Sequence, residues 1–168
     1  MSRTTTNNIQ LNISEKQEYT INGNKENVIK LNPNDMGIIA RTNAVVPKLN
    51  EAEKKYADLM IAMAESGKDD DEFDIETFSE GFTKIDAELR ETVNFLFDYD
   101  VCSVIAKDGS MYDLLDGEYR YVVVVETLIE LYTEAIADET KKRFEKMKRH
   151  TAKYEPQDRK KKISKGTK

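Results

Sequence analysis

The sequence predicts a mainly α protein: a helical domain with a small N-terminal β-hairpin or meander and a disordered basic C-terminal tail. Apolar residues recur at steps of three and four over most of residues 33–155, whereas residues 1–32 contain short alternating runs. The chain has 168 residues, three Pro, no Trp and 35% charged residues, a composition typical of exposed helices. At this length we expect a single domain, with the tail in residues 156–168.

The N-terminal segment alternates apolar with polar residues over 9–13 and 19–21, and residues 28–31 form a third short apolar run. The tight turn Asn22-Gly23-Asn24 separates the last two runs, because Asn and Gly tolerate positive φ. We expect these strands either to pack on the helices or to pair with another subunit through a free edge.

The first helix is expected to run to about Gly67, with Asn34 or Asp35 capping its first amides. Pro47 lies inside this helix, where it removes one backbone donor and clashes with the preceding turn. The sequence therefore predicts a kink or break near Val45.

An acidic linker follows and has some features of a calcium-binding loop. Asp69, Asp71 and Glu80 stand at its first, third and twelfth positions. However, Phe73 and Asp74 occupy the positions that need an oxygen ligand and a Gly. We therefore expect a solvated loop that leads to a helix cap.

Two further helices are expected over 77–97 and from 119 to about 153, with one or two helical turns at 101–106 between them. Val122 to Val125 are four β-branched residues that would also suit a strand, but the helical pattern is far longer than a strand of about five or six residues. Asp113 or Asp116 is expected to cap the last helix. Its apolar stripe consists of Tyr121, Val124, Val125, Leu128, Leu131, Tyr132, Ala135 and Ile136, and thins to Phe144, Met147 and Tyr154.

The sequence shows no catalytic or metal-binding signature. Cys102 is the single cysteine and lies among apolar residues, so we expect a buried thiol and no intrachain disulfide or cysteine metal cluster. His150 is the single histidine, and no motif joins it to Cys102. The sequence therefore predicts a protein that is not an enzyme and has no cofactor. Because it lacks a long apolar run and a signal-peptide core, we expect no membrane partner and a cytoplasmic location.

Charge is distributed unevenly along the chain. Residues 1–140 carry 13 basic and 29 acidic side chains, and residues 141–168 carry 13 basic and 3 acidic ones, so a body of net charge −16 precedes an end of net charge +10. Such an end either binds an acidic partner or is a solvated terminus. The candidate partner-binding residues in the tail are Arg159, Lys160, Lys161, Lys162 and Lys165.

Five short segments carry a resemblance to a known family. They are LNPND at 31–35, FLFDYDVCSVI at 95–105, DGSMYD at 108–113, GEYRY at 117–121 and ETLIELY at 126–132. Together they resemble tail assembly chaperones of phages that infect Gram-positive bacteria, over residues 28–140. The resemblance implies a non-enzymatic protein of the host bacterial cytoplasm that coats the tape-measure protein and helps to recruit tail-tube subunits.

Wide helix stripes and a strand edge would serve these partners and self-association into a homo-oligomer. Two other classes stay open. One is a phage-encoded inhibitor of a host defence nuclease, in which the acidic body imitates nucleic acid. The other is a protein that binds nucleic acid through the basic tail, which we favour less.

Overall fold

The computed structural model describes residues 16–66 and 74–152. Three long helices form the body: α1 (Gly37–Ser66), α2 (Ile75–Phe97) and α4 (Arg120–Ala152). The smaller elements are β1 (Gln17–Ile21), β2 (Asn24–Leu31), α3 (Cys102–Ile105), β3 (Leu114–Leu115) and β4 (Glu118–Tyr119). The predicted mainly α fold with a small N-terminal hairpin is confirmed, and the run of β-branched residues at 122–125 is helical.

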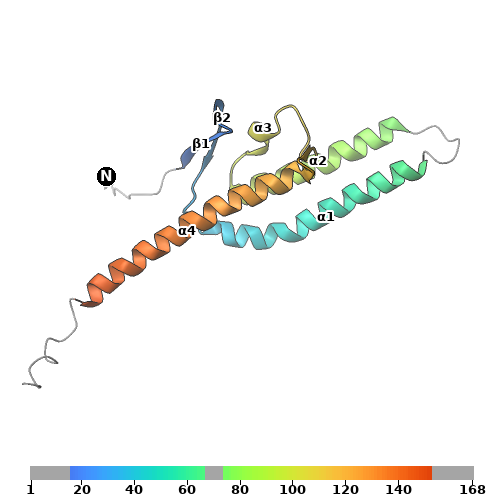
Figure 1. Ribbon diagram of the computed structural model, residues 1–168. Helices are drawn as coiled ribbons and strands as arrows, with labels where there is room; N and C mark the ends of the chain where they lie inside the picture. The colour runs from blue at the N-terminus through green and yellow to red at the C-terminus, as the bar shows by residue number, and fades with distance from the viewer. Residues whose placement is uncertain (1–15, 67–73, 153–168) are drawn as a thin grey trace, which may run out of the picture.

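The helices α1 and α2 run antiparallel to each other, and α4 lies along them and then extends past the body at its C-terminal end (Figure 1). One hydrophobic core joins β2 to all four helices. Its most deeply buried side chains are Ile29, Leu31, Val45, Leu89, Val93, Leu96, Phe97, Val101, Cys102 and Met111. The predicted stripe of α4 contributes to this core through Tyr121, Val124, Leu128 and Tyr132.

The β1–β2 hairpin packs on the helices, since the side chains of Ile29 and Leu31 are fully buried. The two strands are antiparallel, with Tyr19 opposite Ile29. Their turn contains Asn22 and Gly23 at φ values of 51° and 71°, which confirms the predicted tight turn. The alternating run at 9–13 lies outside the described residues.

Acidic side chains satisfy the first amides of two helices. Asp35 Oδ1 accepts a hydrogen bond from the Gly37 N–H at 2.8 Å, before α1. Asp74 Oδ1 accepts one from the Thr77 N–H at 3.1 Å, at the start of α2. Both caps are local in sequence, and both confirm the predicted helix entries.

Of the predicted kink or break near Val45, the break is wrong, because α1 continues through Pro47 without interruption. The helix bends in its first half (Figure 1). Pro47 and Asn43 both lie on the exposed face. Pro47 has no backbone N–H to donate to the carbonyl of Asn43. Because both residues are exposed, water can hydrogen-bond to that carbonyl instead.

The predicted side-chain cap of α4 is also wrong. The carboxylate of Asp113 pairs with the guanidinium of Arg120 at 3.0 Å, and Asp116 lies in the β3–β4 turn at φ 51°. Backbone carbonyls satisfy the first amides instead: the Arg120 N–H donates to Asp113 O at 2.7 Å, and the Tyr121 N–H donates to Met111 O at 3.0 Å. The short β3–β4 hairpin brings these carbonyls to the helix start, where they take the place of a capping side chain for these two amides.

Candidate protein-binding surface

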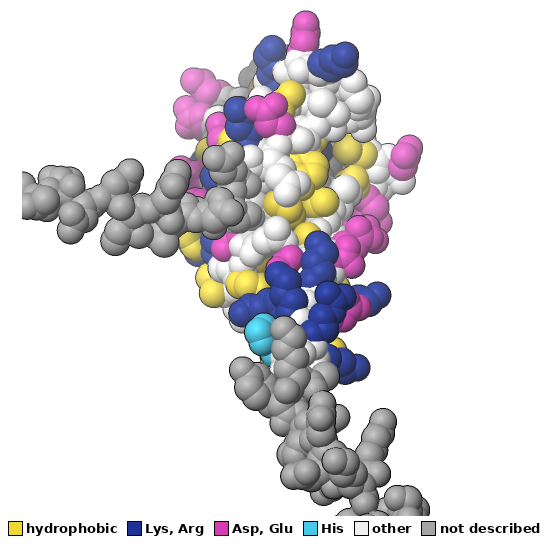
Figure 2. Space-filling view, turned by 90° about the vertical axis from the view of Figure 1, so that its left-hand side faces the viewer, with side chains coloured by type: hydrophobic (Ala, Val, Ile, Leu, Met, Phe, Trp, Pro, Cys, Tyr) yellow, Lys and Arg dark blue, Asp and Glu magenta, His cyan; other side chains and the backbone are white. Residues whose placement is uncertain are grey.

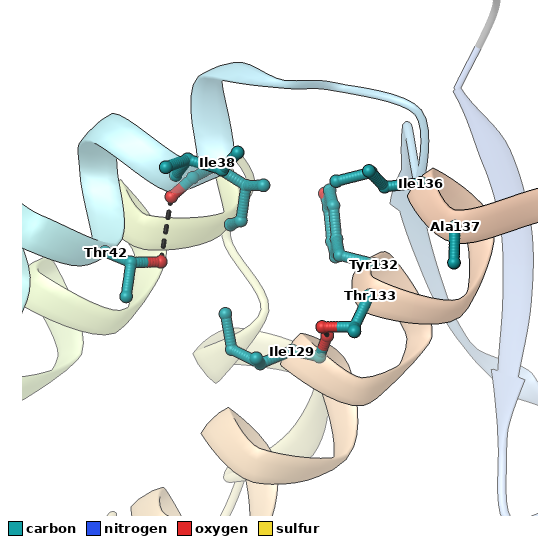
Figure 3. Close-up of a pocket in the computed structure, with 8 residues that line it drawn as sticks. Ile38, Thr42, Ile129, Tyr132, Thr133, Ile136 and Ala137 are labelled. Atoms are coloured by element: carbon teal, nitrogen blue, oxygen red, sulfur yellow. Dashed lines mark hydrogen bonds between the residues drawn. The ribbon is translucent and has the colours of Figure 1, made fainter. Parts of the chain in front are cut away.

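A groove of about 370 Å³ lies between the start of α1 and the middle of α4 (Figure 3). The side chains that line it face one another across the gap between the two helices. They are Ile38, Ile39 and Thr42 from α1, and Ile129, Tyr132, Thr133, Ile136 and Ala137 from α4. All of these lining residues are uncharged.

The polar atoms of the two groove threonines are already used within their own helices. The Thr42 hydroxyl donates to Ile38 O at 2.8 Å, and the Thr133 hydroxyl donates to Ile129 O at 2.8 Å. Burial raises the pKa of Tyr132 to about 12, so its ring enters the groove wall as a neutral group. The groove therefore suits apolar side chains better than a polar or charged ligand.

The apolar stripe of the groove continues along the part of α4 that leaves the body. At about 100° per residue, Thr140, Phe144 and Met147 lie on the same side of the helix as Ile129 and Ile136. Phe144 is 57% exposed and Met147 is 65% exposed. Large apolar side chains thus lie in solvent next to an apolar groove, on one continuous face.

Charge divides α4 into two halves. Residues 126–139 include Glu126, Glu130, Glu134, Asp138 and Glu139 and no basic side chain. Residues 141–149 include Lys141, Lys142, Arg143, Lys146, Lys148 and Arg149, with one acidic side chain, Glu145. Figure 2 shows the basic side chains gathered around His150 on the projecting end, below a hydrophobic patch.

A second exposed apolar area lies where α1 ends and α2 begins. Ile61 is 56% exposed, Met63 is 36% exposed and Ile75 is 70% exposed. The two helices pack side by side here, because a Cβ on Gly81 of α2 would lie 3.3 Å from the Leu59 side chain of α1. We refer to Ile61, Met63 and Ile75 as the α1–α2 tip.

The other candidate sites in the described body are structural. A shallow depression of about 270 Å³ between α1 and α2 is lined by charged side chains, but Lys55 there pairs with Glu51 at 3.3 Å and Glu88 at 2.8 Å. Cys102 is 1% exposed, and burial raises the pKa of its thiol to about 12, which leaves it protonated and unreactive near neutral pH. Within residues 16–66 and 74–152, no group of three or more His, Cys, Asp or Glu is placed to hold a metal ion.

The candidate residues Arg159, Lys160, Lys161, Lys162 and Lys165 lie outside the described residues, as do Asp69 and Asp71 of the acidic linker. The predicted stripe of α4 includes Ile136 but not Thr133, which was expected on the opposite face and instead lines the groove. The helical spacing of Ile129, Thr133, Ile136 and Thr140 is the signal that could have marked this second, less buried face.

In the described part of the chain, no helix is both long and apolar enough to cross a membrane. No protein-family model matches the chain, and neither a curated protein nor a solved structure matches it.

Proposed function

We propose that this protein is a non-enzymatic tail assembly chaperone of a phage, which self-associates and binds the tape-measure and tail-tube proteins in the host bacterial cytoplasm. The observation that carries the proposal is the position of its exposed large apolar side chains. Ile39, Phe144 and Met147 lie along the groove and the projecting end of α4, and Ile61, Met63 and Ile75 form the α1–α2 tip. Exposed apolar side chains on regular helices are typical of surfaces that bind other proteins.

The α1–α2 tip is suited to holding a partner helix. Ile61 and Met63 are two residues apart and project from opposite sides of α1, so an amphipathic partner helix can pack its apolar face on either side of α1 or against Ile75 at the start of α2. A chaperone that coats a long helical protein needs many weak contacts of this kind, so that the client can be released during assembly.

The choice of tape-measure and tail-tube proteins as partners rests on the resemblance of residues 28–140 to tail assembly chaperones. Several of the segments that carry it are structural in this fold: 95–105 and 108–113 pack around Cys102 and Met111 in the core, and 126–132 supplies Leu128. The segments that resemble tail assembly chaperones therefore form the helical body, and both exposed surfaces lie on this body.

Affinity capture of recombinant tape-measure and tail-tube proteins from the same phage tests the proposal. The wild-type chain should retain at least one of them, and the double variant Ile61→Glu/Ile75→Glu should lose most of this binding, because two carboxylates would be buried against the partner. The matched control is Asn50→Glu/Ser79→Glu, which adds two carboxylates at exposed polar positions of the same helices. Equal capture by the wild type and the tip variant would contradict the assignment of this surface.

The two other classes predict different binding. A nucleic-acid-binding protein would retain DNA or RNA with an affinity that falls steeply as salt rises, because phosphate contacts release counterions. A nuclease inhibitor would abolish the activity of a host nuclease at stoichiometric amounts. Either result, obtained without capture of a tail protein, would replace the chaperone proposal.

A further inference from the structure

We infer that the groove is filled by α4 of a second copy of this chain. The two α4 helices pair antiparallel about a two-fold axis near Thr140, and Phe144 and Met147 of each copy enter the groove of the other. This inference says how the self-association in the proposed function occurs. It rests on the proposed function only because both require a homo-oligomer. Three features of α4 support it: the spacing of its apolar stripe, the division of its charges and the chemistry of the groove.

The apolar stripe is symmetric about Thr140. Ile136 and Phe144 lie at equal distances on either side of it, and so do Thr133 and Met147. In an antiparallel pair centred there, Phe144 of one copy faces Ile136 of the other. A helix rises about 1.5 Å per residue, so Met147 reaches about 10 Å beyond the axis. That distance brings it level with the part of the groove lined by Thr133.

The groove presents the surface that such side chains need. Its lining is uncharged and its threonine hydroxyls donate to carbonyls of their own helices, so methyl groups and the Tyr132 ring face the gap. Phe144 and Met147 are more than half exposed in a single copy. Their transfer from water into the groove supplies the apolar burial that stabilises the pair.

Charges beside the stripe match in the same register. At about 100° per residue, Glu130 and Lys148 project from one side of the stripe. They lie at nearly equal distances before and after Thr140, so Glu130 of one copy meets Lys148 of the other. All of these side chains are exposed in a single copy.

Glu139 and Arg143 project from the other side of the stripe, before and after Thr140, so Glu139 of one copy meets Arg143 of the other. An antiparallel pair brings like sides together, and the two-fold axis repeats each contact. Both kinds of charge pair are therefore made twice. Exposed ion pairs of this kind contribute more to orientation than to affinity.

The charge pattern also decides between the two orientations of the pair. In a parallel pair, the acidic residues 126–139 of the two copies would lie together, and so would the basic residues 141–149. Like charges that face each other oppose association. The antiparallel pair places each acidic half against a basic half, and it leaves both α1–α2 tips at the far ends, available to a client.

Thr140→Cys tests the position of the axis, because the two introduced thiols would face each other across it. Helices packed in contact bring facing Cα atoms within disulfide range. Mild oxidation at about 50 µM chain should convert most of this variant to a covalent dimer. The matched control is Asp138→Cys, which lies on the opposite side of α4 and should stay monomeric under the same oxidation. Cys102 can be left in place because it is buried. Equal dimer yields from the two variants would overturn the proposed axis.

A charge exchange tests the register. Arg143→Glu faces Glu139 of the second copy and should weaken dimerisation by about tenfold in sedimentation equilibrium. Glu139→Arg/Arg143→Glu restores opposite charges and should return the dissociation constant to within about threefold of the wild type. All of these positions are exposed, so the melting temperature should stay unchanged at concentrations low enough for every variant to be monomeric. A double variant as weak as the single one would overturn the register.

These measurements separate the dimer from the chaperone function. A chain that stays monomeric at about 50 µM and still captures a tail protein would overturn the dimer and the proposed self-association, and would leave the proposed binding of tail proteins standing. A chain that forms the Thr140→Cys dimer but captures neither tail protein would support the dimer and contradict the function.

Discussion

The carboxylate of Asp86, in the middle of α2, holds the backbone of Met111: its Oδ1 accepts a hydrogen bond from the Met111 N–H at 2.8 Å. The same oxygen accepts a hydrogen bond from the Ser110 hydroxyl at 2.6 Å. Arg90, one turn along α2, donates to Asp86 Oδ2 at 2.6 Å and to the carbonyl oxygens of Ala106 and Gly109. One face of α2 thus fixes residues 106–111, which lie between α3 and β3 and place the buried Met111 side chain.

Asp86→Ala should destabilise the fold strongly. It removes the acceptor of three hydrogen bonds and leaves the half-buried Arg90 guanidinium without its carboxylate. We expect a loss of roughly 2–4 kcal/mol in the free energy of unfolding, measured with urea. Asp108→Ala is the control, because Asp108 is exposed on the same loop and its loss should cost less than about 0.5 kcal/mol. Similar costs for the two variants would show that the network carries little stability.

The carboxylate of Asp86 should also make the free energy of unfolding depend on pH. Burial by itself raises the pKa of Asp86, but hydrogen bonds from Ser110, Arg90 and Met111 outweigh it and hold the pKa below the ordinary value for aspartate. The unfolded chain therefore binds the proton first, at its ordinary pKa of about 3.9. The stabilisation is complete above that value and is lost as the pH falls through the lower pKa of the folded state.

Urea titrations of the wild type and Asp86→Asn at several pH values measure this contribution. The difference in unfolding free energy between them should be largest near neutral pH and should shrink below about pH 4. The reason is that only the wild-type carboxylate takes up a proton in that range. A difference that stays constant from pH 7 to pH 3 would show that the charge of Asp86 is not what stabilises the loop.

Leu128 tests the core face of α4. It is 6% exposed, so Leu128→Asp would bury an unpaired carboxylate, and we expect a loss of more than about 4 kcal/mol or complete unfolding. The neighbouring residue Thr127 is exposed, and Thr127→Asp should melt within a few degrees of the wild type. Circular dichroism melts of the two variants provide the comparison. Equal melting temperatures would mean that the face carrying Leu128 is open to solvent.

Removal of the basic tail should weaken partner binding and leave the stability of the body unchanged. A chain ended at residue 158 loses Arg159, Lys160, Lys161, Lys162 and Lys165, all of which follow the last helical residue of α4, Ala152. We expect its melting temperature to stay within about 2 °C of the full chain, and its capture of an acidic partner to weaken, most clearly at low salt. Unchanged capture at low salt would show that the tail is a solvated end that takes no part in partner binding.

The long helices were predictable because their evidence is local. Val124, Leu128 and Tyr132 recur at helical spacing within one stretch, and Asp35 and Asp74 lie within three residues of the amides they cap. The β1–β2 turn was equally local, because Asn22 and Gly23 are neighbours that both tolerate positive φ.

The features that sequence analysis missed depend on contacts between distant segments. Ile38 and Ile136 line one groove only because α1 and α4 pack together, and no local pattern shows that two residues so far apart in the sequence meet. Asp113 appeared to be a cap because of its position before α4. Its carboxylate is directed instead to Arg120 and to the Ser110 N–H by the short β3–β4 hairpin.

The central claim is that exposed apolar surfaces on a helical body let this protein act as a chaperone for a tail protein. The most direct measurement is the soluble fraction of the tape-measure protein after centrifugation, expressed alone, with the wild-type chain, with Ile61→Glu/Ile75→Glu, or with the control Asn50→Glu/Ser79→Glu. We predict that the wild type and the control keep most of the tape-measure protein soluble and that the tip variant does not. A soluble fraction that is the same with the wild type, with the tip variant and without any partner would contradict the claim.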